Sequence, residues 1–271
     1  MAATTKISWC DATFNPWVGC SRVSPGCQNC YAENLMDKRY HKVKWGPGQP
    51  RQLTKTWKDP IKWNKQAEDE GVRKKVFCAS LADWLDPEVP EHWLIDLMGL
   101  IQMCPHLDWL MLTKRPERAF EGPTKWFTGL CLPNVWFGVS VESRKYYDLR
   151  VEQMRSIPAA VHWVSYEPAL GALSDLCDNP TGAFFPDWLV IGGESSQEMP
   201  ARPFEISWAV RVINLCRKYT ISPFMKQVGS NATYRGEPYR TKDRAGADPA
   251  EWPESIRVRE FPGVQATEML K

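Results

Sequence analysis

Short apolar segments alternate with longer segments of mixed polarity along most of the chain. Seven apolar segments are predicted strands, at residues 12–19, 76–83, 109–115, 135–143, 161–168, 188–195 and 223–229. The segments between them predict helices at residues 90–104, 116–121, 143–156 and 205–219. Strands that alternate with helices indicate parallel βαβ units, and strands that are apolar on both faces indicate a sheet covered by helices. The pattern therefore predicts an α/β fold, a full or partial (β/α) TIM-like barrel.

Polar residues follow the predicted strands, at the positions where barrel enzymes place their chemistry. They are Ser80, Asp83, Lys114, Arg115, Ser140, Glu142, Glu167, Gly192, Gly193, Glu194, Lys226 and Gln227. Each of them alone is compatible with a surface position or a helix cap, and glycines also serve tight turns. Six strand ends that each carry a charge or a hydroxyl nevertheless predict one shared pocket at this face of the barrel.

Three cysteines, Cys20, Cys27 and Cys30, lie in one short loop with the spacing C-x6-C-x2-C. A structural zinc site takes four protein ligands, and Cys10 or His41 is available as the fourth. Three thiolates around a [4Fe–4S] cluster would instead leave one iron open for another ligand. Because thiolates serve both metals, the spacing alone leaves a cluster and a zinc site equally open.

The cysteine count argues against a disulfide framework. The 271 residues include nine cysteines, an odd number, and the chain does not start with a secretory signal peptide. This usage predicts a reducing, cytoplasmic location. No apolar run approaches the roughly 20 residues that cross a bilayer, so no membrane association is expected. Cysteines in apolar runs are predicted core residues, namely Cys78, Cys104, Cys131, Cys177 and Cys216.

Charge is unevenly distributed along the chain. The net charge is +2, but residues 38–65 hold nine lysines and arginines and one acid, Asp59, which gives +8 locally and −6 elsewhere. Trp45, Trp57 and Trp63 are interleaved with these cations. Cations neutralise phosphates and exposed aromatic rings stack on unpaired bases, so this segment is a candidate DNA-binding insertion. The alternative is a solvated loop whose tryptophans pack onto the main fold.

The chain resembles a phage-associated family of radical S-adenosylmethionine (SAM)-like proteins. The stretches that carry the resemblance are ISWCDATFNPWVGCSRVSPGCQNCYAE, SLADW, LTKRPERA, GVSVES, SYEPALG, VIGGES, FMKQVGS and GADPAEWPESIRVREFP. The resemblance implies one radical SAM barrel domain over residues 1–271, with the basic insertion at about 38–65 and a C-terminal extension from about 230. Two features depart from the commonest radical SAM pattern. Six residues rather than three separate Cys20 from Cys27, and Asn29 replaces an aromatic residue that commonly packs on adenine, a contact that Tyr31 could make instead.

Under this resemblance the three cysteines bind a [4Fe–4S] cluster, and zinc becomes the minor alternative. The open iron would bind the amino and carboxylate groups of SAM. An electron from the cluster, itself supplied by a separate electron donor, would cleave SAM to a 5′-deoxyadenosyl radical. The candidate cofactor-binding residues are Ser80 and Asp83 for the methionine amino group, Lys114 or Arg115 for its carboxylate, Ser140 and Glu142 for the ribose, and Gly192 and Gly193.

Phage members of the family are associated with hypermodified thymidine in DNA, which places the expected activity in the host cytoplasm. The implied reaction is an isomerisation at the thymine 5-methylene, in which glycine attached through nitrogen becomes attached through its α-carbon. Lys226, with Arg115 second, is the candidate for the adduct carboxylate, and Glu167 or Glu194 for the amine proton. A base in duplex DNA would have to be flipped, or the strand bound single. Another radical SAM reaction on nucleic acid and a zinc-stabilised nucleic-acid-binding protein are the alternatives.

Overall fold

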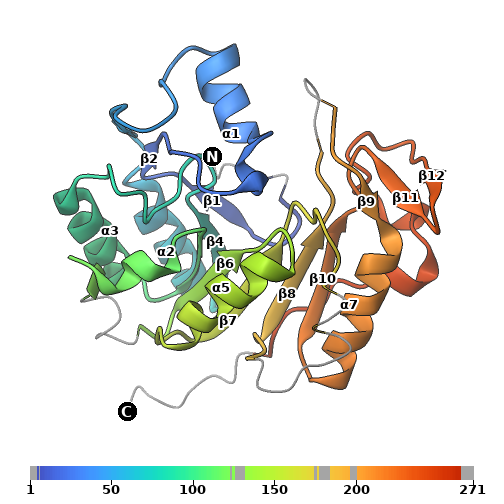
Figure 1. Ribbon diagram of the computed structural model, residues 1–271. Helices are drawn as coiled ribbons and strands as arrows, with labels where there is room; N and C mark the ends of the chain where they lie inside the picture. The colour runs from blue at the N-terminus through green and yellow to red at the C-terminus, as the bar shows by residue number, and fades with distance from the viewer. Residues whose placement is uncertain are drawn as a thin grey trace.

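Seven parallel strands form the main sheet of the computed structural model, which describes Thr5 and residues 7–122, 124–125, 132–173, 176, 184–195 and 200–263. The strands are β1 (Ala12–Phe14), β4 (Lys74–Cys78), β5 (Leu107–Thr113), β6 (Val135–Ser140), β7 (Val161–Tyr166), β8 (Trp188–Gly192) and β10 (Ser222–Gln227). Their order in the sheet follows the chain, and every neighbouring pair is parallel (Figure 1). In the described residues the edge strands β1 and β10 do not pair with each other, so the sheet is an open, partial barrel.

Four helices cover one face of this sheet. They are α2 (Asp59–Glu70), α3 (Glu91–Met103), α5 (Arg144–Arg155) and α7 (Ile206–Lys218). Side chains alternate between the two faces of a strand, and one set, which includes Val76 and Met111, shares an apolar core with helix residues such as Val212. A doubly wound sheet has helices on both faces, whereas a barrel has one outer helical layer. The predicted fold class, a partial TIM-like α/β barrel, is confirmed.

Aromatic side chains fill the other face of the sheet. The ring of Trp9 lies 5.3 Å from that of Trp163, and Trp163 lies 5.3 Å from Trp188, measured between ring centroids. Gly138 of β6 makes room for this cluster, because a β-carbon there would lie 2.2 Å from the Trp163 indole. Such aromatic pairs contribute about 0.5–1.5 kcal/mol each beyond their buried area. The interior of the partial barrel is therefore a packed core.

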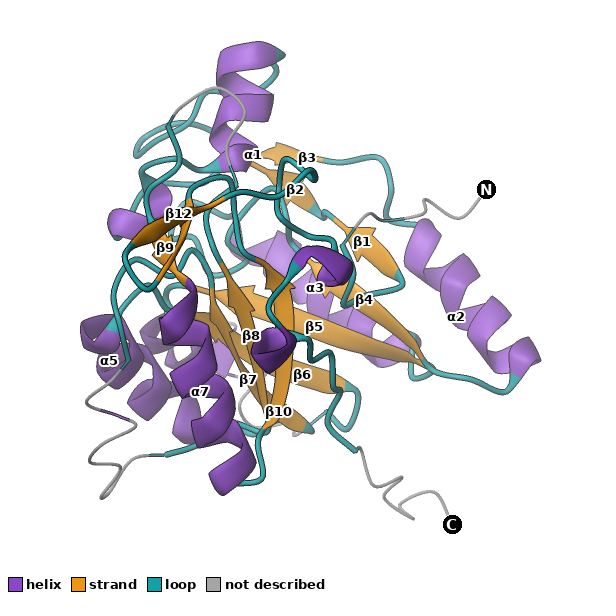
Figure 2. Cartoon of the chain, turned by 90° about the vertical axis from the view of Figure 1, so that its right-hand side faces the viewer, coloured by secondary structure: helices purple, strands orange, loops and turns teal. Residues whose placement is uncertain are grey.

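The predicted strands are all found, with ends that shift by a few residues. The segment predicted at 12–19 is divided into β1 and β2 (Trp17–Val18), and β2 pairs antiparallel with β3 (Gln52–Leu53). Figure 2 shows β2, β3 and the short helix α1 (Tyr31–Glu33) gathered at one end of the main sheet. The predicted helices at 90–104, 143–156 and 205–219 are α3, α5 and α7, whereas 116–121 is the 3-10 helix η3 (Pro116–Phe120).

Helix α2 corrects the expectation that residues 38–65 form a loop. Pro60 stands in its first turn, where the missing N–H costs nothing, and Gly71 ends it in the left-handed conformation with φ 65°. Trp63 and Ala67 lie one turn apart and are buried in the core. The loop that the Gly-Pro-Gly sequence at residues 46–48 predicts lies upstream of this helix.

The described residues from 230 to 263 pack against the barrel. Strand β11 (Ala232–Tyr234) pairs with β9 (Phe204–Glu205) and with β12 (Glu237–Tyr239), and the 3-10 helices η4 (Pro249–Glu251) and η5 (Glu254–Ile256) follow. No helix among the described residues is long and apolar enough to cross a membrane. The cysteines predicted to lie in the core are buried where described, at Cys78, Cys104 and Cys216, while Cys131 and Cys177 lie outside the described residues.

Candidate functional site

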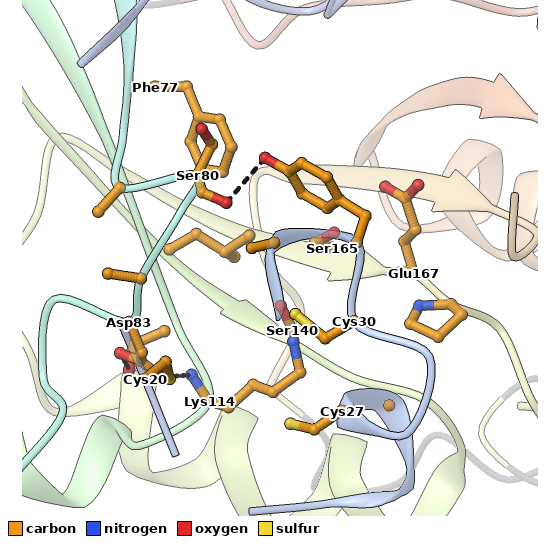
Figure 3. A pocket seen from close by; sticks show the side chains of 18 of the residues that line it. Cys20, Cys27, Cys30, Phe77, Ser80, Asp83, Lys114, Ser140, Ser165 and Glu167 are labelled. Atoms are coloured by element: carbon orange, nitrogen blue, oxygen red, sulfur yellow. Dashed lines mark hydrogen bonds between the residues drawn. The ribbon is translucent and has the colours of Figure 1, made fainter. Parts of the chain in front are cut away.

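The cysteine loop lies at the carboxyl end of the sheet and faces a cavity. It leaves β2, passes Cys20, forms the 3-10 helix η1 (Pro25–Cys27) and ends at Cys30, just before α1. All three cysteines line one cavity of about 430 Å³, and Figure 3 shows their side chains around the long side chain of Lys114. The loop therefore brings its three thiols into a single space.

Eight predicted site residues line the same cavity, because the carboxyl ends of neighbouring parallel strands meet at one face. They are Ser80, Asp83, Lys114, Arg115, Ser140, Glu167, Glu194 and Lys226. Glu142, Gly192 and Gly193 do not line it. The two glycines are needed for packing, since a β-carbon on Gly193 would lie 2.2 Å from the Val228 carbonyl oxygen and one on Gly192 would meet Glu167 at 2.9 Å.

Arg115, after β5, fastens the first part of the cysteine loop. Its guanidinium donates to the Ser21 carbonyl at 2.7 Å and to the Cys20 sulfur at 3.6 Å. It also pairs with Asp83 at 2.9 Å and with Asp86 at 3.2 Å. Asp83 in turn accepts hydrogen bonds from the Thr113 hydroxyl and from the backbone amide of Lys114, just after β5. These contacts occupy the guanidinium, so Arg115 holds the loop and is not free to bind a carboxylate of SAM or substrate.

Glu142, after β6, fastens the middle of the loop. One carboxylate oxygen accepts hydrogen bonds from the Ser24 hydroxyl and from the Gly26 amide at 3.2 Å. The other pairs with Arg150 at 2.8 Å, and the side chains of both partners are almost fully buried, at 1% and 3% exposure. Glu142 therefore supports the middle of the loop and does not line the cavity, and its contact with the ribose of SAM stays a prediction.

Glu194, after β8, fastens the last part of the loop. It accepts a hydrogen bond at 2.9 Å from the Asn29 amide, between Cys27 and Cys30, and it pairs with Arg202. Burial raises the pKa of Glu194, but the hydrogen bonds from Arg202 and Asn29 outweigh burial and lower it below its ordinary value. A carboxylate held in this way is a weaker proton acceptor, so the contacts of Glu194 favour a loop anchor, and its role as a base stays a prediction.

Gly26 offers a direct test of this anchoring. A β-carbon at Gly26 would lie 2.5 Å from the Glu142 carboxylate, which its ion pair with Arg150 holds in place. We expect Gly26→Ala to displace the loop, to cost about 1–3 kcal/mol of unfolding free energy in urea denaturation, and to lower metal content. Gly99→Ala is the control, because nothing lies within 4 Å of its β-carbon position in α3 and alanine favours a helix. Equal stability of the two variants would contradict the anchoring role.

Lys114 is the cation that remains available in the cavity. In the part of the chain that the structure describes, its ammonium group has no hydrogen-bond or ion-pair partner, whereas the neighbouring Arg115 is fully engaged. Figure 3 shows the side chain extending from the end of β5 toward Cys30. Its positive charge opposes the effect of burial on the Cys30 thiol, whose pKa is nonetheless raised. The ammonium is thus placed to meet an anion in the cavity.

Glu167 and Lys226 form an ion pair at another part of the cavity wall. Their side chains lie 2.5 Å apart and keep 18% and 23% exposure, so both are reachable from the cavity. Gln227 also donates to Glu167, at 3.3 Å. Tyr31 lines the same cavity, and its hydroxyl donates a hydrogen bond at 2.8 Å to the Ser80 carbonyl. An acid and a base are therefore paired, and part-exposed, opposite the cysteines.

The two residues considered as a fourth metal ligand lie away from the cavity lining. Cys10 precedes β1 and its sulfur contacts the Ile7 carbonyl at 4.0 Å, and His41 is exposed. No three Cys, His, Asp or Glu side chains of the described residues converge closely enough to hold a single metal ion. A [4Fe–4S] cluster does not require such convergence, because each thiolate binds a different iron. The donor set, three thiols with no fourth cysteine or histidine among the described residues of the lining, fits a cluster.

Burial sets the protonation of the unligated Cys20 thiol. It raises the pKa of Cys20 to about 12, with Asp83 adding to the effect and Arg115 opposing it. The Cys20 thiol is therefore neutral near pH 7, and it becomes a thiolate only when a metal compensates the charge. Metal loading of this site releases protons and weakens as the pH falls.

Several lining residues were missed in the sequence, Ser165 and Trp45 among them. Ser165, in β7, was hidden inside an apolar strand, and Trp45, in the basic segment, lines the cavity, whereas Trp57 and Trp63 pack onto the fold. The basic segment is also not one surface. Arg51 is buried against Asp86 at 2.7 Å, and residues 59–65 belong to α2. Only the part before Arg51 borders the cavity, which corrects the picture of a continuous DNA-binding insertion.

One protein family matches most of the chain. Its model, described as "Protein of unknown function (DUF5131)", matches residues 4–255. No curated protein matches the chain.

Among solved structures, three of spore photoproduct lyase, two variants and one complex, are similar at a distance. A cysteine variant has 12% sequence identity to this chain and a TM-score of 0.48. The complex with dinucleoside spore photoproduct has 10% identity and a TM-score of 0.46. Each of the two alignments covers 76% of this chain and 58% of the other chain. A double variant with bound AdoMet and the same dinucleoside has 12% identity and a TM-score of 0.43, and the alignment covers 62% of this chain and 48% of the other chain. This chain thus spans about half the length of those proteins.

Proposed function

Because the chain belongs to the DUF5131 family, whose function is unknown, we propose from its own site that it is a radical SAM enzyme. One observation carries the proposal: three cysteines of a single loop line a cavity at the carboxyl face of a partial (β/α) barrel, and no fourth cysteine or histidine of the described residues joins them. A [4Fe–4S] cluster bound there would supply the open iron and the electron that radical cleavage of SAM requires. The remaining steps fall to the protein's own side chains.

Lys114 is the residue that we assign to the carboxylate of SAM. Its ammonium is free in the described structure and lies beside Cys30, so it can donate a charge-assisted hydrogen bond. The hydroxyls of Ser140 and Ser165, from neighbouring strands in register, face the same cavity and are suited to the ribose. We also assign Ser80 to the methionine amino group, because Ser80 lines the cavity and its carbonyl, which accepts a hydrogen bond from Tyr31, can accept a second one.

The Glu167–Lys226 pair is the substrate end of the site in this proposal. A substrate carboxylate that displaces Glu167 from Lys226 would gain a cation, and the released Glu167 would accept a proton from an amine. These are the two groups of a glycine adduct on thymine. The resemblance of the sequence to phage proteins supports the finer proposal, isomerisation of N-linked to Cα-linked glycinyl-thymidine in phage DNA. Repair or another modification of a nucleobase would use the same cavity.

Iron and sulfide analysis after anaerobic purification tests the proposal. About four iron and four sulfide ions per chain, together with release of 5′-deoxyadenosine from SAM after reduction, are expected. Stoichiometric zinc would refute the cluster. A cluster without any SAM cleavage, in the presence of a reductant, would refute the radical SAM assignment while leaving an iron–sulfur protein.

Replacement of Lys114 tests the cofactor pocket. We expect Lys114→Met to weaken SAM binding roughly ten- to a hundredfold, because a hydrogen bond to a charged group contributes about 1.5–3 kcal/mol. Iron content should be unchanged, since Lys114 anchors no part of the loop. Lys218→Met is the control, because Lys218 is exposed at the end of α7. Isothermal titration with SAM gives the measurement, and equal affinities in both variants would remove Lys114 from the pocket.

A further inference from the structure

A second cavity, of about 490 Å³, lies beside the first. The two share Asn29, Tyr31 and Ser195 in their walls, so they meet at the end of the cysteine loop. Its volume is within the range of small-molecule sites. Nothing in the proposed chemistry of the cluster and SAM uses this space.

Two arginines from distant parts of the chain line the second cavity. Arg39 ends the π-helical turn η2 (Asn34–Arg39) that follows α1, and Arg244 belongs to the loop before η4. Both side chains are exposed, and the guanidinium of Arg39 lies 5.6 Å from the ring centre of Tyr40. Asp243 is the acid in the lining, and its carboxylate is tied to its own loop by the Ala247 amide. The cavity thus presents two guanidinium groups and one locally bonded acid.

We propose that the second cavity binds the sugar–phosphate backbone of the nucleotide adjacent to the one whose base enters the first cavity. Arginine forks match phosphate oxygens in two-point hydrogen bonds, and backbone contacts of this kind position a strand without reading its sequence. This assignment rests on the proposed nucleic-acid substrate and adds where the strand runs. Of the cations at 38–65, Arg39 is the one that lines either cavity, so its charge has a specific task.

Tyr31 separates the two spaces. Tyr31 lines both cavities, and its hydroxyl donates a hydrogen bond to the Ser80 carbonyl at 2.8 Å. An aromatic ring in that position can stack on a base that leaves its neighbours, and such stacking tolerates any base. A single strand crossing Tyr31 would then place one base with the cysteines and the next phosphate with the arginines.

Binding of a short fluorescein-labelled oligothymidylate, followed by anisotropy over a range of salt concentrations, tests the assignment. We expect Arg39→Gln and Arg244→Gln each to weaken binding and to reduce the slope of log affinity against log salt by about 0.7, the value for one phosphate contact on a single strand. Arg217→Gln, on the exposed end of α7, is the control and should keep the original slope. Iron content is measured in parallel and should stay the same in all variants.

Each alternative outcome decides the question. Unchanged slopes in both cavity variants, with binding retained, overturn the backbone site and leave the radical SAM proposal intact. Weaker binding of SAM alone, with oligothymidylate binding intact, places the cofactor in the second cavity and overturns the assignment. Absence of binding by the unaltered protein overturns both this site and the nucleic-acid substrate, while iron content still reports on the cluster separately.

Discussion

Replacing any one of Cys20, Cys27 and Cys30 by alanine is expected to reduce iron and sulfide content to background after anaerobic purification or reconstitution. Each thiolate would hold a different iron of a [4Fe–4S] cluster, and none of the other described cysteines lines the cavity to take its place. The same substitution at Cys10 should leave the iron content unchanged. Cys10 precedes β1 and does not line the cavity, although its sulfur contacts the carbonyl of Ile7, which does.

The comparison is sharp because all four variants remove the same atoms. Unfolding by urea should show that the variants at the loop remain folded in the absence of metal, since their thiols are bonded only weakly: Cys27, for example, has the Ser24 hydroxyl 3.9 Å away. Iron retained in a Cys27→Ala protein, or iron lost in Cys10→Ala, would contradict the three-cysteine assignment. Zinc bound in a ratio of one per chain and lost on replacing Cys10 would favour the four-ligand alternative.

The main sheet could be predicted because its signal is local. Each parallel strand is a short apolar run that ends in a polar residue, and this pattern located all seven strands and the face where they end. Helix α2 was not predicted because its apolar residues, Trp63 and Ala67, are surrounded in the sequence by charged and polar residues and follow the Gly-Pro-Gly loop at residues 46–48. Pro60 and Gly71, a start and a stop signal 11 residues apart, were the clue that the sequence did contain.

The roles of the polar residues could not be predicted, because those roles depend on contacts between distant parts of the chain. Glu142 and Ser140 follow the same strand and look equivalent in the sequence. In the fold, Ser140 faces the cavity while Glu142 reaches Ser24, which is 118 positions away. Arg115 and Lys114 are adjacent cations, yet Arg115 is bound to Asp83 and to the cysteine loop, whereas the Lys114 ammonium is free in the described structure. The sequence therefore predicts which residues gather at the cavity, but only the packing shows which of them hold the cysteine loop and which face the cavity.

Glu142→Ala separates these two kinds of role most clearly, because it leaves the Arg150 guanidinium buried at 3% exposure without its partner. Loss of one member of a buried ion pair costs about 3–5 kcal/mol, so we expect a decrease of that size in the free energy of unfolding measured by urea denaturation. Glu152→Ala is the matched control on α5, with its side chain 67% exposed and a weak pair to Arg155, and it should change stability by less than about 1 kcal/mol.

The double variant Glu142→Leu/Arg150→Met distinguishes loss of the pair from loss of the loop anchor. Replacing both partners by apolar side chains removes the unpaired charge, so most of the stability should return. Iron loading should remain impaired, because Ser24 and Gly26 would still lack the carboxylate that holds the middle of the cysteine loop. If Glu142→Ala were as stable as the original protein and bound SAM more weakly at full iron content, Glu142 would contact the cofactor and not the loop.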